Sequence, residues 1–237
     1  MAPPTEGFSK RTSRLQADLV EQGRRVQAML EAAFESLFED NAKRAGEVVA
    51  QDDVIDAADV EIERACVALL TDATRQGAEI EPQQLRHVLT IAKVNNEMER
   101  VADVAVDLAE LAQQVNAAHG APLPDTFRVM ANSVIGILRD VNTAMLRNDA
   151  PLANIVLQSQ HAVSSFKAAI LRDAEEKISR GQMTVDLAFR LHEIASQCEI
   201  IADHCTNVAE QVIYLTTGAI VRHMPNSWVE LPRPKTA

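Results

Sequence analysis

The sequence predicts an all-α protein made of two pseudo-symmetric halves, each an antiparallel three-helix bundle. Its 237 residues include only 8 glycines and 9 prolines, and Ala, Val, Leu, Glu, Asp and Arg abound, which is typical of helices. No segment shows sustained alternation of apolar and polar residues, so we expect no sheet. The segment VNNEMERVADVAVDLAE at 94–110 is echoed one hundred positions later by IASQCEIIADHCTNVAE at 194–210. A shared pattern at a fixed offset indicates an internal duplication.

The first half is expected to contain three long helices. Residues 1–11 carry two prolines and few apolar groups, and we expect them to be disordered. Apolar residues then recur at spacings of three and four, which predicts a long amphipathic helix. Gly77 is placed to end the second helix, and Pro82 suits the first turn of the third. The expected helices cover residues 12–40, 41–74 and 82–118.

The second half repeats this plan after a break at Gly120, Pro122 and Pro124. Asp125 is expected to cap the fourth helix, and Thr184 the sixth. The fifth helix is expected to start at Pro151 and to end at Gly181, and the sixth to end near Gly218. Short connections favour an up-down-up order in each bundle. We therefore divide the chain into a first repeat at 12–120, a second repeat at 121–223 and a tail at 224–237.

Each motif helix is predicted to carry a narrow acidic stripe. At 3.6 residues per turn, residues four apart share one side of a helix, so Glu99, Asp103 and Asp107 fall within about 80° of one another. Apolar residues of the same helix collect on the opposite side. Stacked carboxylates repel one another, and they supply the oxygen ligands that a hard cation prefers. A solvated surface partly neutralised by Arg100 would give the same pattern, so both interpretations stay open.

A further acidic line is predicted on the second helix, at Asp52, Asp56, Asp59 and Glu63. This helix runs antiparallel to the third, and its carboxylates could add ligands to the first stripe. The corresponding part of the fifth helix, at 160–165, has lost the acidic line. We therefore expect the two halves to bind a cation unequally.

The composition limits the classes of partner. A formal net charge of −11 and a pI near 5.0 argue against nucleic acid and anionic membranes, and suit a basic protein surface or bound cations. Three cysteines without a CxxC pair fit a reducing compartment. The N-terminus lacks the apolar region of a signal peptide, and the uncharged run at 211–221 is too short to span a bilayer. We expect a cytoplasmic protein without direct membrane insertion.

These residues carry a family resemblance. The segments ERVAD at 99–103 and EIIAD at 199–203, with the endings VDLAE and TNVAE, resemble the doubled motif of the PhoU family. The acidic segment at 52–70 resembles its second-helix signature, and QVIYLTTGAIVRH at 211–223 its C-terminal stretch. The resemblance implies two three-helix bundles and a cytoplasmic negative regulator of the phosphate regulon. It also implies two partners, the ATPase subunit of the phosphate ABC transporter and a sensor histidine kinase. Together with that transporter partner, the long apolar helix faces lead us to expect a homodimer.

Some PhoU proteins bind metal clusters through E/D-x-x-x-D positions. Carried over by position, the resemblance implies ligands for iron, zinc or another divalent cation at Glu99, Asp103, Asp107, Glu199, Asp203 and Asn207. This chain departs from the family motif at Ala102 and Ala202, where Gly is usual, and at Ile200, where Arg is usual. Asp107 stands where Asn is common, which should strengthen the first site.

Other classes of protein are weighed against this one. A ferritin-like di-metal oxidase requires Glu-x-x-His pairs, and none of the six histidines has Glu or Asp three residues before it. A structural coiled-coil scaffold predicts unbroken heptads, which the Gly and Pro residues interrupt. A bundle that only scavenges metal stays open. With no Gly-rich phosphate loop and no catalytic signature, we expect the protein not to be an enzyme. His204 and Cys205 are expected to pack in the core rather than to ligate zinc.

Overall fold

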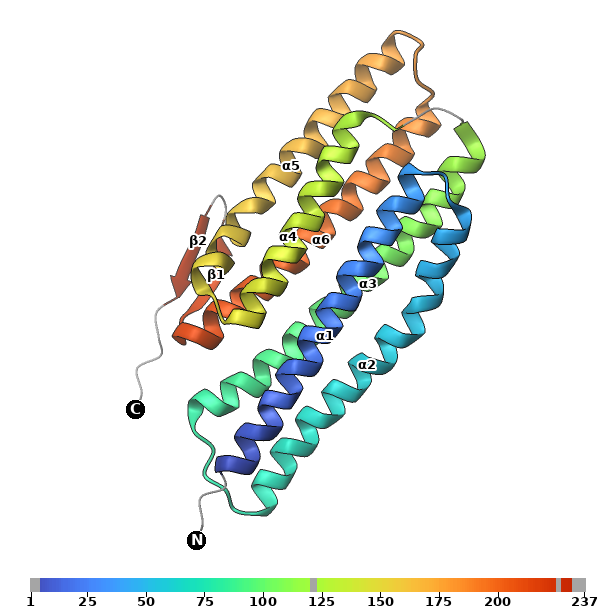
Figure 1. Cartoon of the computed structure of the whole chain (residues 1–237). Helices are drawn as coiled ribbons and strands as arrows, with labels where there is room; N and C mark the ends of the chain where they lie inside the picture. Colours follow the sequence, from blue (N-terminus) through green and yellow to red (C-terminus); the bar gives the residue numbers. More distant parts are fainter. Residues whose placement is uncertain (1–4, 120–122, 225–226, 232–237) are drawn as a thin grey trace.

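The computed structural model describes the backbone of residues 5–119, 123–224 and 227–231, and the side chains of 7–112 and 123–221. Within these residues the chain forms six long helices followed by a two-stranded hairpin (Figure 1). The elements are α1 (Thr5–Phe38), α2 (Ala42–Arg75), α3 (Pro82–His119), α4 (Asp125–Arg147), α5 (Ala150–Ser179), α6 (Val185–Thr217), β1 (Ile220–Met224) and β2 (Ser227–Leu231).

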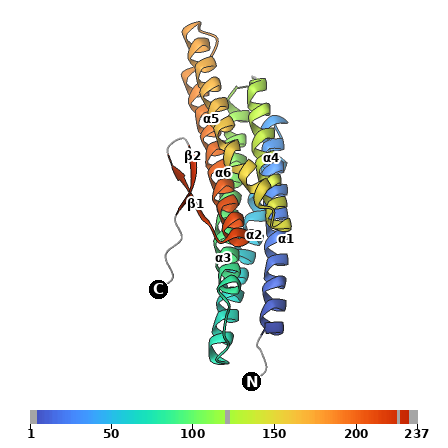
Figure 2. The ribbon, with the colours of Figure 1, turned by 90° about the vertical axis from the view of Figure 1, so that its left-hand side faces the viewer.

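The helices form two bundles that lie against each other. Helices α1, α2 and α3 pack together, and α4, α5 and α6 make the second trio. The trios meet where α3 packs on α6 and α1 packs on α4. Both views show a molecule elongated along its helices (Figure 1, Figure 2). The predicted fold of two antiparallel three-helix bundles is confirmed.

Side-chain caps begin several of the helices. The Thr184 hydroxyl accepts a hydrogen bond from the Leu187 amide at 3.2 Å, as predicted for the start of α6. The prediction for Asp125 is wrong, because Pro124 occupies the cap position without a side-chain bond and Asp125 is the first helical residue. A carboxylate in the first turn still interacts favourably with the positive end of the helix dipole.

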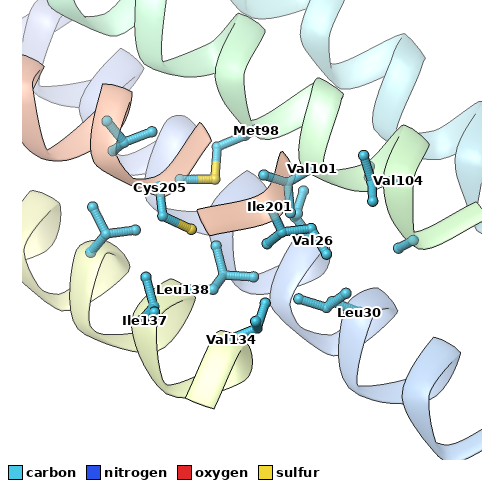
Figure 3. Packing of buried hydrophobic residues seen from close by; sticks show 14 of the residues in the cluster. Val26, Leu30, Met98, Val101, Val104, Val134, Ile137, Leu138, Ile201 and Cys205 are labelled. Atoms are coloured by element: carbon cyan, nitrogen blue, oxygen red, sulfur yellow. The ribbon is translucent and has the colours of Figure 1, made fainter. Parts of the chain in front are cut away.

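One hydrophobic core runs through both bundles. Apolar side chains of α1, α3, α4 and α6 interdigitate where the trios meet (Figure 3). This central part includes Val26, Leu30, Met98, Val101, Val134, Leu138, Ile201 and Cys205, all of them buried. Burial of apolar surface contributes roughly 25 cal/mol per Å², so this shared core holds the two halves together.

The start of α1 corrects a prediction. Residues 1–11 were expected to be disordered, but α1 begins at Thr5. Phe8 is buried, and its carbonyl accepts a hydrogen bond from the Thr12 hydroxyl at 3.0 Å. The phenyl ring extends the apolar face of α1 by one further turn, which the sparse apolar content of this stretch did not indicate.

The hairpin corrects a second prediction, that there would be no sheet. Strand β1 pairs with β2 in antiparallel register, with Ile220 opposite Leu231 and Met224 opposite Ser227. The hairpin follows α6 and lies beside the α5–α6 pair in both views (Figure 1, Figure 2). Each strand has only five residues, too few for a sustained alternating pattern. In the part of the chain that the structure describes, none of the helices is both long and apolar enough to cross a membrane.

Candidate functional site

The two motif helices turn their acidic stripes away from the core. In α3, Val101 and Ala102 are buried, whereas Glu99 is half-buried and Asp103 and Asp107 are exposed. The same positions of α6 repeat this arrangement, with a half-buried Glu199 and exposed Asp203 and Asn207. The helical spacing therefore separates a packing face from an acidic face, as the sequence predicts.

In the first half, the acidic line of α2 lies beside the stripe of α3. Partial loss of solvent raises the pKa of Asp103, and the charges of Asp56 and Asp107 raise it further. Burial likewise raises the pKa of Glu99, with added contributions from Asp103, Asp59 and Asp56. The carboxylates of the two helices thus destabilise one another's charged forms. We call this group, together with Asp52, the first acidic cluster.

The positive charge near the first acidic cluster does not balance it. Arg100 lowers the pKa of Glu99 and of Asp103, but the net direction for both groups stays upward. Burial and the charges of Asp56, Asp103 and Asp53 also raise the pKa of Asp52. The cluster therefore carries excess negative charge, which a bound cation would stabilise.

Asn95 supports one edge of this cluster from the interior. It is 1% exposed, and its Nδ2 donates to the Asp59 carbonyl oxygen at 2.9 Å and to Asp59 Oδ1 at 2.6 Å. These two bonds fix the Asp59 side chain on α2 against α3. Sequence reasoning missed this residue, because its role depends on a contact 36 positions away.

The cluster offers the oxygen donors that a hard cation prefers, but its carboxylates are not arranged as a coordination sphere. Among the described side chains, no group of three or more His, Cys, Asp and Glu is gathered so that it could hold a metal ion. The donors in the first half are carboxylate oxygens on two adjacent helices, the type that divalent hard cations prefer. Ion binding there requires the exposed carboxylates to rotate toward one another.

The second half already contains an internal cation. Lys167 Nζ on α5 lies 2.6 Å from Glu199 Oε2, and Gln160 Nε2 donates to Asp203 Oδ1. Burial alone would raise the pKa of Glu199, but hydrogen bonds from Lys167 and Ser164 and the charge of Lys167 lower it overall. Glu199 is therefore paired with a cation of the protein itself, and Asp203 accepts a hydrogen bond from a neutral amide.

Asp107 and Asn207, the last residues of the two predicted ligand triplets, each form a hydrogen bond with the other half of the chain. Asn207 Nδ2 donates to Glu97 Oε2 at 3.1 Å, and Gln197 Nε2 donates to Asp107 Oδ2 at 3.1 Å. His204 Nδ1 also lies 2.7 Å from Glu97 Oε2. The same offset of one hundred residues relates Glu97 to Gln197 and Asp107 to Asn207, so the two amide–carboxylate bonds are equivalent.

These cross-half bonds change the interpretation of two residues. Burial raises the pKa of Glu97, but hydrogen bonds from His204 and Asn207 outweigh it, so the net direction is downward. The prediction of core packing is wrong for His204, which pairs with Glu97 at the junction of the halves. It is confirmed for Cys205, which is 1% exposed. Glu97 and Gln197 were missed, although the repeat offset could have paired them.

The three cysteines are buried and free. Burial raises the pKa of Cys66 to about 11 and of Cys198 to about 12, and it also raises the pKa of Cys205. A thiol with a raised pKa holds little thiolate, which is the nucleophilic and metal-binding form. These cysteines therefore serve packing.

The fold and the site together define a class: a duplicated helical protein in which each repeat turns an acidic helix face outward. The model of the PhoU domain matches the chain twice, at residues 19–112 and 127–212. The chain belongs to the PhoU family. This membership sets aside the ferritin-like and coiled-coil alternatives.

The similarity to known relatives covers most of the chain. The phosphate-specific transport system accessory protein PhoU homolog 1 of Thermotoga maritima is 28% identical over 218 residues, covering 89% of each chain. The corresponding PhoU homolog of Aquifex aeolicus is 29% identical over 216 residues, covering 90% of this chain and 95% of that protein.

Solved structures share the fold. The crystal structure of the phosphate transport system regulatory protein PhoU from Streptococcus pneumoniae superposes with a TM-score of 0.82 at 20% identity, covering 91% of this chain and 100% of that one. PhoU from Pseudomonas aeruginosa gives a TM-score of 0.82 at 24% identity, covering 89% and 99%. These likenesses confirm the predicted helical architecture.

Proposed function

We propose that this protein is a cytoplasmic accessory protein of phosphate uptake and a negative regulator of the phosphate regulon. Its support is the double match to the PhoU domain and the relatives whose names describe accessory proteins of a phosphate-specific transport system. In this role it links the ATPase subunit of a phosphate ABC transporter to a sensor histidine kinase. It works as an adaptor and not as an enzyme.

The acidic surface supports an adaptor role. The chain carries a formal net charge of −11, and the carboxylates of α2 and α3 project from one side of the first half. Such a surface favours basic patches on partners and accelerates their association. We propose that a second copy of the chain completes a homodimer, which leaves this acidic side open to the transporter and the kinase.

A divalent cation on the first acidic cluster is the second part of the proposal. The observation that supports it is the raised pKa of Asp52, Asp59, Glu99 and Asp103, each of which has lost solvent and faces other carboxylates. A cation such as Mn²⁺, iron or zinc would cancel this repulsion and place a positive centre on an otherwise acidic face. Glu99 and Asp103 are the central ligands of this site, with Asp107 at its edge.

Deletion of the protein in its native cell tests the regulatory role. In high phosphate, cells that lack the protein should express the phosphate-regulated genes, because the link that keeps the kinase signal off is missing. Expression is compared in cells carrying the wild-type chain and in cells carrying none. Continued repression in the deletion strain would show that the negative-regulator proposal is wrong.

Elemental analysis tests the cation. The full chain is freed of metal with EDTA, incubated with Mn²⁺ and separated from unbound ion. E99Q/D103N should lose most of the bound Mn²⁺, whereas E175Q/E176Q, which removes two carboxylates from an exposed part of α5, should keep it. Circular dichroism confirms that each variant stays helical. Equal Mn²⁺ content in all three proteins would contradict the assignment.

A further inference from the structure

The second half holds an ammonium group where the first half holds carboxylates. Lys167 Nζ sits 2.6 Å from Glu199 Oε2, with side chains only 19% and 29% exposed. The other lysine–carboxylate bridge on α5, between Lys177 and Asp173, has side chains 38% and 44% exposed. The Lys167 bridge is thus the more enclosed one, and enclosure strengthens an ion pair because water screens it less.

The repeat shows which first-half residue this lysine replaces. On α5, Gln160 contacts Asp203 and Lys167, seven residues further on, contacts Glu199. The side-chain caps that begin α2 and α5, Asn41 and Asp149, stand 108 positions apart, and the same offset relates Asp52 to Gln160 and Asp59 to Lys167. On α2, the charge of Asp103, the equivalent of Asp203, raises the pKa of Asp52.

Asp59 of α2 lies near Glu99, the equivalent of Glu199, and its charge raises the pKa of Glu99. Lys167 therefore stands where the first half has Asp59, and Gln160 where it has Asp52. Four carboxylates of the first half correspond to two carboxylates, one amide and one ammonium in the second.

We propose that Lys167 is a built-in substitute for a metal ion, so that the second half takes up no divalent cation. The Lys167 ammonium contacts the Glu199 carboxylate that the family motif would offer to a metal. Gln160 donates a hydrogen bond to Asp203, the next carboxylate of the motif. A divalent ion entering here would have to displace the lysine and be repelled by it. The single-site consequence rests on the proposed cation binding of the first half, whereas the role of Lys167 does not.

The first experiment removes the Lys167 ammonium from a chain in which the proposed cation site of the first half has been disabled. E99Q/D103N serves as the background, and K167M is added to it, with K177M as the matched control on the same helix. After treatment with EDTA, K167M should lower the Tm by about 2–4 °C, the shift that corresponds to roughly 1 kcal/mol in a chain of this size. K177M, which removes an exposed bridge, should change it far less.

Adding Mn²⁺ then gives the deciding measurement. Mn²⁺ should restore the Tm of the K167M chain, because the ion takes the vacated place between Glu199 and Asp203. It should leave the K177M chain and the background unchanged. A Mn²⁺ response in the background itself, or the absence of rescue in K167M, would overturn the proposal.

A second experiment converts the second half into a copy of the first. Q160D/K167D in the same background should bind Mn²⁺ in a calorimetric titration, and the further change D203N should weaken that binding at least tenfold. Failure of Q160D/K167D to bind Mn²⁺ would count against the proposal. If the wild-type chain binds no Mn²⁺ while K167M is rescued, the first-half cation site is wrong and the role of Lys167 stands.

Discussion

The same substitution at equivalent positions of the two repeats should have opposite effects on stability. Glu99 and Glu199 share one place in the duplicated motif, but the pKa of Glu99 is raised and that of Glu199 is lowered from the ordinary value of 4.5. At neutral pH the charged form of Glu99 therefore destabilises the folded state, whereas the charged form of Glu199 stabilises it. We predict that E99Q stabilises the protein at pH 7 and that E199Q destabilises it.

The magnitudes follow from the surroundings of each carboxylate. Glu99 is half-buried and repelled by several acids, each interaction being worth a few tenths of a kcal/mol, so E99Q should gain about 0.5 kcal/mol in unfolding free energy. E199Q leaves the Lys167 ammonium without its partner at a site that is only partly exposed, and should lose about 1–2 kcal/mol.

The pH dependence gives each effect a sign. The raised pKa of Glu99 means that the folded state binds this proton more tightly, so its penalty grows as the pH rises through and above 4.5. The lowered pKa of Glu199 means that its contribution is present above 4.5 and is lost as the pH falls through the folded-state value. Both effects should therefore shrink as the pH falls: that of E99Q below 4.5, and that of E199Q as the pH passes the folded-state pKa of Glu199.

Urea denaturation followed by circular dichroism measures these differences. The proteins are compared in EDTA at low ionic strength, at pH 7 and near pH 3. Raising the ionic strength to about 1 M should shrink both effects, because the Debye length falls to about 3 Å. Shifts of the same sign at pH 7, or a loss of more than 1 kcal/mol in E99Q, would refute the electrostatic difference between the repeats.

Three further predictions concern the junction of the halves and the end of α6. M98A removes a fully buried side chain where the bundles meet and should cost about 2–5 kcal/mol in urea denaturation; a loss below 1 kcal/mol would contradict the shared core. E97A and H204A should each destabilise the protein, and a double-mutant cycle should give a coupling energy of about 0.5–3 kcal/mol between the two side chains. Additive losses would show that the 2.7 Å contact between Glu97 and His204 does not contribute to stability. G218A should lower stability by about 1 kcal/mol in the same assay, because φ is 73° and the added Cβ would lie 3.0 Å from Arg86 Nη1; an unchanged midpoint would show that the helix end adapts.

Local signals in the sequence were sufficient for most of the fold. The apolar spacing and the Gly and Pro breaks predicted α2 at 41–74, and the structure has Ala42–Arg75. The outward direction of the acidic stripes also followed from helical periodicity alone. Short or sparse signals were less informative: five-residue strands cannot show a sustained alternation, and Phe8 stands alone among polar neighbours.

The candidate site was predictable only in part, because its chemistry depends on contacts between distant segments. Spacing identified Glu99 and Glu199 as equivalent, but only packing shows that one faces carboxylates and the other faces Lys167. The loss of acids on the fifth helix follows from the sequence, whereas the role of the lysine that replaces them depends on its contact with Glu199. Asp107 and Asn207 were assigned to the cluster of their own half, and their observed partners lie 90 and 110 positions away.

The paired bonds between Glu97 and Asn207 and between Asp107 and Gln197 have an evolutionary consequence. In an isologous dimer, residue i of one subunit meets residue j of the other, and j meets i in return. The two bonds retain that relation across one hundred residues of offset, which is the pattern expected if a three-helix chain that paired with itself about a twofold axis were duplicated and joined. A homodimer encodes one helix for both places, whereas a joined chain can place a lysine in one repeat and keep carboxylates in the other.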